Sequence, residues 1–107
     1  MRTIFICACL VLSSPVCRPQ GFVCAVGGGG ENYNAWSDAP YRWIVQRADS
    51  QRIILLSASP EDSWLPTYFH SLGADSVFNY MISTPAVAND SATYNAIRGC
   101  RGVFIKG

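Results

Sequence analysis

Four adjacent glycines directly before an acidic residue form the stretch of this sequence with the clearest potential for chemistry. They occupy residues 27–30 within CAVGGGGENYNAW. Glycine loses more backbone freedom on folding than other residues, so a run of four indicates a particular requirement. A dinucleotide loop needs G-x-G-x-x-G, but Gly27 and Gly29 are followed by Asn32 at the third position. Glu31 would also repel a pyrophosphate. We therefore interpret the run as bare backbone that a ligand or a second backbone approaches closely.

A second candidate is the loop SASPED at residues 57–62, which follows an apolar run. A serine there could be a nucleophile, but the chain contains no G-x-S-x-G turn. A Ser-His-Asp set would have to use His70, the sole histidine, which falls late in a predicted helix. We favour a structural role in which Ser59 or Ser63 caps that helix and the two loop carboxylates lie near its positive end. His70 is predicted to be a surface or partly packed residue.

The composition does not indicate a site for a metal ion, a cofactor or a nucleic acid. The five cysteines include no C-x-x-C pair, and one histidine cannot complete a usual zinc site, so we predict neither a metal nor a cofactor. Cys24 and Cys100 are interpreted as small buried apolar residues. Eight basic and seven acidic side chains give a net charge of +1 without a basic stripe. Nucleic acid is therefore not an expected partner.

Residues 1–20 differ from the rest of the chain. Met1 and Arg2 give a positive start, and the apolar run TIFICACLVL follows before Ser-Ser-Pro. A run of about ten apolar residues is too short to span a bilayer and suits a secretory signal. The sequence after it matches a cleavage site poorly, and a buried first strand is the alternative. We expect a secreted or periplasmic protein without stable membrane insertion.

From residue 21 onward, apolar runs alternate with helically spaced apolar residues. A third helix is predicted to turn Ala92, Ala96 and Ile97 inward. Pro40 and Pro66 fit the first turns of the two earlier helices, and Gly73 is a plausible C-cap. Strands are predicted over 21–26, 52–58, 76–82 and 102–105, helices over about 37–48, 63–72 and 91–98, and a loop over 85–89.

This alternation predicts an α/β fold: one domain over residues 21–107 with a doubly wound, mainly parallel open sheet. The glycine run, Ser59 and Gly107 would all lie at the carboxyl ends of strands, where such sheets bind ligands. The chain ends after the predicted fourth strand with no helix to cover it. We therefore expect the N-terminal part of a longer domain. We also expect marginal stability and self-association through the exposed last strand, as in a homo-oligomer.

Residues 22–107 resemble the N-terminal half of cyanophycinase-like proteins of serine peptidase family S51. These proteins have a flavodoxin-like, class I glutamine amidotransferase-like fold. VGGGGE resembles the family's first strand and glycine turn, and RIILLSAS resembles its second strand. YFHSLGADSV resembles the helix, turn and third strand. ATYNAIRGCRGVFIKG resembles the helix and strand that lead into a G-G-D-Q turn, of which Gly107 would be the first glycine.

The resemblance implies a serine hydrolase of peptide or isopeptide bonds, with acidic dipeptide-type bonds or cyanophycin as substrate. The family's G-S-A-G-type nucleophile turn and its triad histidine would lie beyond the last residue, and His70 does not match that histidine. The chain would therefore carry one wall of a substrate site, no catalytic residue and no peptidase activity of its own. The alternative is a non-catalytic α/β module that binds a small acidic or amide ligand at its glycine-rich rim. The residues assigned to substrate binding are Gly28, Gly29, Gly30, Glu31, Ser59 and Gly107.

Overall fold

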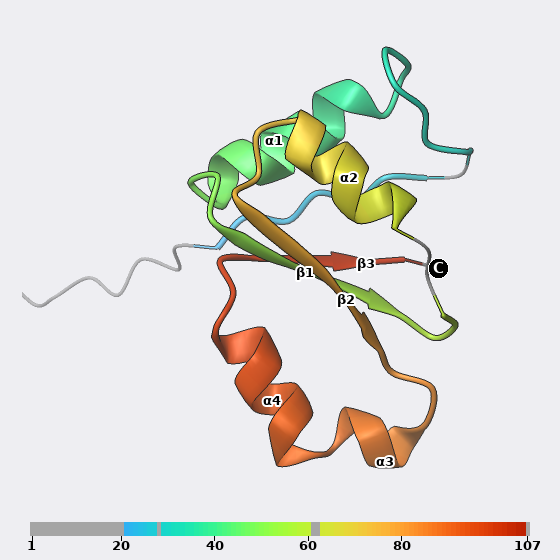
Figure 1. Ribbon diagram of the computed structural model, residues 1–107, viewed down its shortest axis with the longest axis vertical. Coiled ribbons are helices and arrows are strands. Elements are labelled where there is room, and N and C mark those ends of the chain that lie inside the picture. Colours follow the sequence, from blue (N-terminus) through green and yellow to red (C-terminus); the bar gives the residue numbers. More distant parts are fainter. Residues whose placement is uncertain (1–20, 28, 61–62, 107) are drawn as a thin grey trace, which may run out of the picture.

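The computed structural model describes residues 21–27, 29–60 and 63–106. The predictions for the leader, for Gly28 and for Gly107 concern residues outside these ranges. The described residues form an α/β domain whose three parallel strands lie in the order β2-β1-β3 (Figure 1). In chain order the elements are α1 (Asp38–Arg47), β1 (Arg52–Ser57), α2 (Trp64–Ser71), β2 (Ser76–Met81), α3 (Pro85–Ala88), α4 (Ser91–Arg98) and β3 (Gly102–Ile105).

Strand β1 is the centre of the sheet. It pairs in parallel with β2, Arg52 lying opposite Ser76, and with β3, Ile53 lying opposite Gly102. Its sequence RIILLS is buried at every position after Arg52. A strand covered on both faces has no solvent-facing side, which explains the continuous apolar run instead of an alternating one. The prediction of a buried strand here is confirmed.

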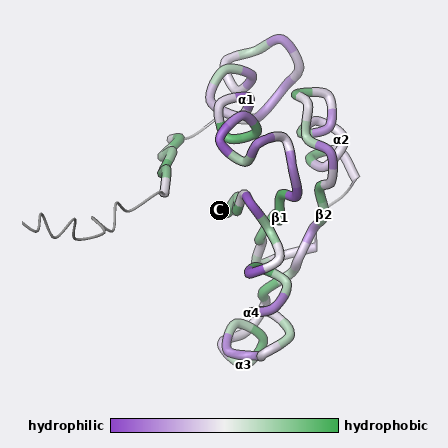
Figure 2. Tube along the Cα trace, turned by 90° about the vertical axis from the view of Figure 1, so that its left-hand side faces the viewer, coloured by the Kyte–Doolittle hydropathy of each residue, from purple (hydrophilic) through white to green (hydrophobic). Residues whose placement is uncertain are grey.

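Helices lie on both faces of the sheet: α1 and α2 on one, α3 and α4 on the other (Figures 1 and 2). The main apolar core lies on the α1 and α2 side. Its rings include Tyr41, which stacks on Phe69 with 5.4 Å between centroids and meets Phe104 edge-on at 5.0 Å. The core consists of Tyr41, Val45, Ala48, Ile53, Leu55, Leu65, Tyr68, Phe69, Leu72 and Ala74. No helix in the described part of the chain is long and apolar enough to cross a membrane.

Helix α2 ends just before a glycine, Gly73, for a conformational reason. Gly73 has a φ of 106°, in the region that favours glycine. Its N–H donates to the His70 carbonyl oxygen at 3.0 Å, and the Ala74 N–H donates to the Phe69 carbonyl at 3.1 Å. This pair of bonds is a Schellman motif, which satisfies the last carbonyls of the helix. The predicted end of the helix at this glycine is confirmed, with Leu72 as the C-cap residue and Gly73 directly after it.

Segment 21–26, predicted as the first strand, is the main correction to the expected fold. These residues are extended but belong to no strand, and their side chains are exposed. The sheet described here therefore has three strands and not four. The expected burial of Cys24 is also wrong, because its side chain is exposed, whereas Cys100 is half-buried. Apolar composition favours a strand, but ladder hydrogen bonds to a neighbour are what form one.

The region after β2 holds two smaller corrections. Residues expected to form a loop include the short helix α3, which Thr84 caps by accepting from the Val87 N–H at 3.3 Å. In α4 the buried side chain is Thr93, whereas Ala92 is exposed and Ala96 and Ile97 are half-buried. Thr93 Oγ1 donates to the Val87 carbonyl at 2.6 Å and lies 3.0 Å from Tyr80 Oη, so it joins α3, α4 and β2.

Gly102 lies where β3 passes under the end of α1, and we expect Gly102→Ala to destabilise the fold. A Cβ at this position would lie 3.1 Å from Ile53 Cγ1 and 3.2 Å from Ala48 Cβ, and both neighbours are buried. Such overpacking costs about 1–3 kcal/mol. At Gly99, where φ is −77° and a Cβ would meet nothing closer than 3.5 Å, alanine is expected to stabilise by about 0.4–1 kcal/mol. Urea unfolding of both variants tests this contrast, and equal effects would contradict it.

Candidate functional site

The carboxyl ends of β1 and β3 border a small hollow of about 300 Å³. From β1 the chain runs first to β2, which lies on one side of β1, and then to β3, which lies on the other side of β1. The strand order therefore reverses between β1 and β3, and open α/β sheets bind ligands where the order reverses. The hollow therefore occupies the expected place for a site. It is lined by Leu56, Ser57, Ala58, Ile82, Ile105 and Lys106.

Backbone and hydroxyl bonds hold the loop after β1 in this position. Ser57, which is buried, donates its Oγ hydrogen to the Ser59 carbonyl oxygen at 2.6 Å. The Ile82 N–H donates to the Ser57 carbonyl at 2.8 Å, and the Lys106 N–H donates to the Leu56 carbonyl at 2.9 Å. The end of β1 is thus connected to the residues that follow β2 and β3.

The assignment of Ser59 to substrate binding stays a prediction. Ser59 is exposed and lies beside the hollow, but Ser57, which was not selected from the sequence, is the serine that lines it. The predicted helix cap is wrong. Ser63 occupies the N-cap position of α2, and its hydroxyl makes no capping bond, because its backbone is already helical. The carboxylates at 61 and 62 lie outside the described residues.

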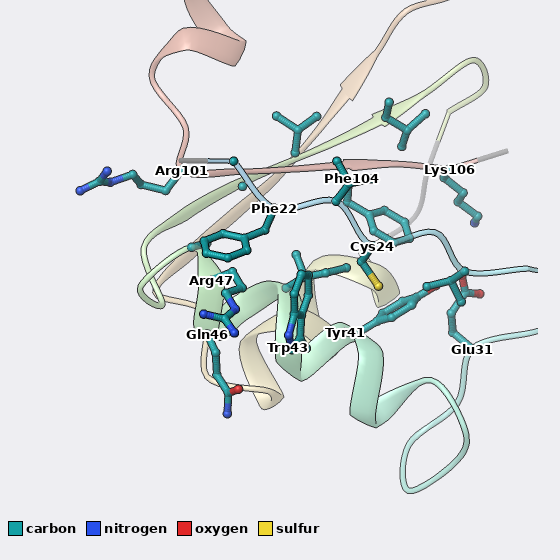
Figure 3. Close-up of a pocket in the computed structure, with 18 of the residues that line it drawn as sticks. Phe22, Cys24, Glu31, Tyr41, Trp43, Gln46, Arg47, Arg101, Phe104 and Lys106 are labelled. Carbon is teal, nitrogen blue, oxygen red and sulfur yellow. The ribbon is translucent and has the colours of Figure 1, made fainter. Parts of the chain in front are cut away.

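A second and larger hollow, of about 1340 Å³, separates the segment before α1 from β3 (Figure 3). Gly27, Gly29 and Glu31 line one side of it. Ile105 and Lys106 line the other side and also border the smaller hollow. The glycine run and the end of β1 therefore face two adjacent hollows that meet at the end of β3. Gly30 lines neither hollow.

The glycine turn is held in place by Trp36. Gly29 has a φ of 120°, and a Cβ on it would lie 3.4 Å from the indole ring. The indole Nε1–H donates to the Gly30 carbonyl at 3.0 Å. Glu31 is fixed separately, since its Oε1 accepts a hydrogen bond from Tyr41 Oη at 2.8 Å. The need for glycine at position 29 comes from its positive φ, since a Cβ there would make only ordinary van der Waals contact with the ring.

A buried hydroxyl network lies beneath the start of α1. Ser37 is fully buried, and its Oγ lies 2.8 Å from Tyr68 Oη. Tyr68 Oη donates to Asp38 Oδ1 at 2.5 Å, and Asp38 Oδ2 accepts from the Asn34 N–H at 3.1 Å. Ser37 Oγ also lies 3.2 Å from the Asn32 carbonyl oxygen, so its single hydrogen is shared between that oxygen and Tyr68 Oη. The network ties α2 to the turn that follows the glycines.

Burial and neighbouring carboxylates keep Tyr41 and Tyr68 neutral. Burial raises the pKa of Tyr41 well above its usual range, and the hydrogen bond and negative charge of Glu31 raise it further. Burial likewise raises the pKa of Tyr68, and the hydrogen bond to Asp38 adds to this against the opposing effect of Ser37. Burial also raises the pKa of the Cys100 thiol. Neither tyrosine is suited to act as a general base.

His70 is a surface residue, as predicted, and it lines neither hollow. It is exposed near the end of α2, and its Nδ1 lies 2.8 Å from the Ala74 carbonyl oxygen. Because Ala74 precedes β2, this histidine lies at the amino edge of the sheet, opposite the hollow beside Ser57. No hydrogen bond joins it to a serine side chain among the described residues. Among the described residues, no three His, Cys, Asp or Glu side chains gather in a way that could hold a metal ion.

Comparison with known proteins identifies no relative of this chain. No family model, no curated protein and no solved structure matches the chain.

Proposed function

We propose that this chain is the N-terminal part of a serine-type hydrolase of peptide or isopeptide bonds, similar to the cyanophycinase-like proteins of peptidase family S51. On this proposal its sheet belongs to the flavodoxin-like, class I glutamine amidotransferase-like arrangement, and the protein is secreted or periplasmic. The observation that carries the proposal is the hollow between the carboxyl ends of β1 and β3. It lies at the switch point where an open α/β sheet binds its ligand.

Within this proposal, the described residues bind and orient the substrate. Gly29 presents backbone without a side chain to the larger hollow, and the Trp36 indole, which is bonded to the Gly30 carbonyl, fixes its position. Lys106 borders both hollows and supplies a positive charge that suits the carboxylate of an acidic substrate. The catalytic serine and histidine of the family would follow residue 107. The chain of 107 residues would therefore bind an acidic substrate without cleaving it.

We expect the purified chain to show no hydrolysis of an isoaspartyl dipeptide or of cyanophycin. Ser59 has no basic side chain described as its partner, and His70 lies at the opposite edge of the sheet. Release of amino groups from each substrate, followed over hours, measures this. Hydrolysis that Ser59→Ala abolishes would contradict the proposal, because the catalyst would then lie within these residues.

A binding measurement tests whether the chain recognises an acidic substrate. Titration of the isoaspartyl dipeptide is expected to shift the amide resonances of residues 57–59 and 105–106. Lys106→Gln is expected to weaken binding by about threefold to tenfold, the loss of one partly exposed charge pair. Arg101→Gln is the matched control, because Arg101 lies at the far end of β3 and borders only the larger hollow. Equal effects of the two variants, or shifts spread evenly over the chain, would contradict the proposed site.

A non-catalytic binding module for a small acidic or amide ligand is the second candidate. The closed hydroxyl network favours it, since Ser37, Tyr68 and Asp38 are bonded to one another and none of the three is a free nucleophile. The coding sequence after residue 107 separates the two. Gly-Asp-Gln followed by a G-x-S-A-G turn supports the hydrolase, whereas a stop codon supports the binding module.

A further inference from the structure

One asparagine of this chain is followed by the residues that N-linked glycosylation requires. Asn89, Asp90 and Ser91 match the acceptor pattern N-x-S/T, in which the middle residue is anything except proline. The pattern is short and also arises by chance, so its position in the fold decides whether it can be an acceptor. The other asparagines have no serine or threonine two positions later: Asn32, Asn34, Asn79 and Asn95.

The acceptor pattern lies at the surface, where two helices meet. Asn89 is the C-cap of α3 and Asp90 is the N-cap of α4, at the end of the molecule away from α1 and α2 (Figure 1). Asn89, Asp90 and Ser91 are all exposed, and none of them lines either hollow. A glycan is bulky and hydrated, so it is carried at the surface. An oligosaccharide joined to Asn89 would displace no packed side chain.

The bonds around Asn89 are compatible with the modification. Asn89 Nδ2 donates one hydrogen to the Pro85 carbonyl oxygen at 2.8 Å. A side-chain amide nitrogen carries two hydrogens, and a glycosidic bond replaces only one of them, so the other can still be donated. Ser91 Oγ, the hydroxyl that completes the pattern, lies 3.4 Å from Asp90 Oδ1, which is a long and exposed contact. The acceptor nitrogen and the hydroxyl are thus held only by bonds at the surface.

Helix α3, which ends at the acceptor asparagine, opens at little cost. The glycan-transferring enzyme must reach both the Asn89 amide and the Ser91 hydroxyl. Helix α3 has four residues, and none of them is buried. Helical turns of this length are marginal in water, and segments with few buried contacts open locally at low free energy. The pattern can therefore extend toward an enzyme while the sheet stays folded.

We propose that Asn89 is an N-linked glycosylation site. The reaction joins Asn89 Nδ2 to the anomeric carbon of an oligosaccharide that is carried on a lipid pyrophosphate. The bond between that carbon and the pyrophosphate oxygen breaks, the lipid pyrophosphate leaves, and the amide loses one proton. This inference rests on the proposed secretion, because the acceptor pattern acts in secreted proteins, and it is independent of the proposed hydrolase activity.

Intact-mass measurement of the full chain secreted from eukaryotic cells tests the site. We expect the mass to be increased by an oligosaccharide that peptide N-glycosidase removes. Asn89→Gln and Ser91→Ala are each expected to abolish the increase, whereas Ser91→Thr, which keeps the hydroxyl, should retain it. Asn95→Gln is the matched control, because Asn95 is also exposed but lies outside the pattern, and it should leave the increase unchanged.

The measurement is made by two routes of export, so that failure of the site and failure of secretion can be told apart. In one, residues 1–20 are the only signal, and in the other a standard secretory signal precedes the full chain. Unmodified protein in the medium by either route would overturn the proposed site, as would a glycan that persists in Asn89→Gln. Export by the added signal alone, with a glycan on Asn89, would support the site and contradict the proposed secretion.

Discussion

Tyr68→Ala is expected to lower the free energy of unfolding by about 3–5 kcal/mol, enough to unfold much of a small domain. The Tyr68 ring is fully buried and stacks on Trp64 with 4.9 Å between centroids. Its hydroxyl group also bonds Ser37 and Asp38 beneath the glycine turn. The substitution removes packing and leaves two polar groups without their partner. Chemical unfolding followed by tryptophan fluorescence measures the change.

Two further variants divide this effect into its parts. Tyr68→Phe keeps the ring and is expected to cost about 1–3 kcal/mol, because the Ser37 hydroxyl and the Asp38 carboxylate lose a buried partner. Tyr94→Ala is the matched control, since Tyr94 is 62% exposed, and it should change stability by no more than about 0.5 kcal/mol. If Tyr94→Ala were as damaging as Tyr68→Ala, the assigned core would be wrong.

Alkaline pH is expected to unfold the protein through Tyr41 and Tyr68. Both have a pKa raised above the ordinary value of 10.0 in the folded state. Below about pH 10 each tyrosine is protonated in both states, so stability does not depend on this ionisation. Above about pH 10 the unfolded chain loses its protons first, and stability falls until the folded tyrosines ionise too. The slope should approach about 1.4 kcal/mol per pH unit for each tyrosine.

The variant that tests this slope is Tyr41→Phe. It loses the bond to Glu31 and is less stable at pH 8, yet its stability should fall less steeply between about pH 10 and 12. Tyr94→Phe should keep the full slope of the unsubstituted protein. The Cys100 thiol is present in all three proteins, so its contribution cancels. An unchanged slope in Tyr41→Phe would contradict a raised pKa at that residue.

The helices α1, α2 and α4 and the three paired strands could be predicted from the sequence because their signals are local. Apolar residues at helical spacing mark α1 and α2, with Pro40 and Pro66 in their first turns as predicted. The run after Arg52 marks the buried central strand. Gly73 fixes the end of α2 through its own positive φ. Each of these features depends on a few neighbouring residues, and so each can be read from a short stretch of sequence.

The features that sequence reasoning missed depend on distant partners. Segment 21–26 has strand-forming residues, but its own sequence does not determine whether it pairs with a neighbouring strand. Ser37 bonds Tyr68 31 residues away, and no local pattern predicts that pair. Likewise Ser57 lines the site because the hollow forms between β1 and β3, which the fold alone brings together. A three-dimensional arrangement is needed to find residues of this kind.

The central place of β1 has a consequence for the order of folding. Its partner in β2 lies 24 residues along the chain, Arg52 with Ser76, whereas its partner in β3 lies 49 residues away, Ile53 with Gly102. The shorter loop costs less conformational entropy to close. Helix α2 lies between these two strands in the chain and packs against them. The unit β1-α2-β2 therefore assembles before β3 arrives. During synthesis this unit leaves the ribosome first, so β3 joins a template that is already formed.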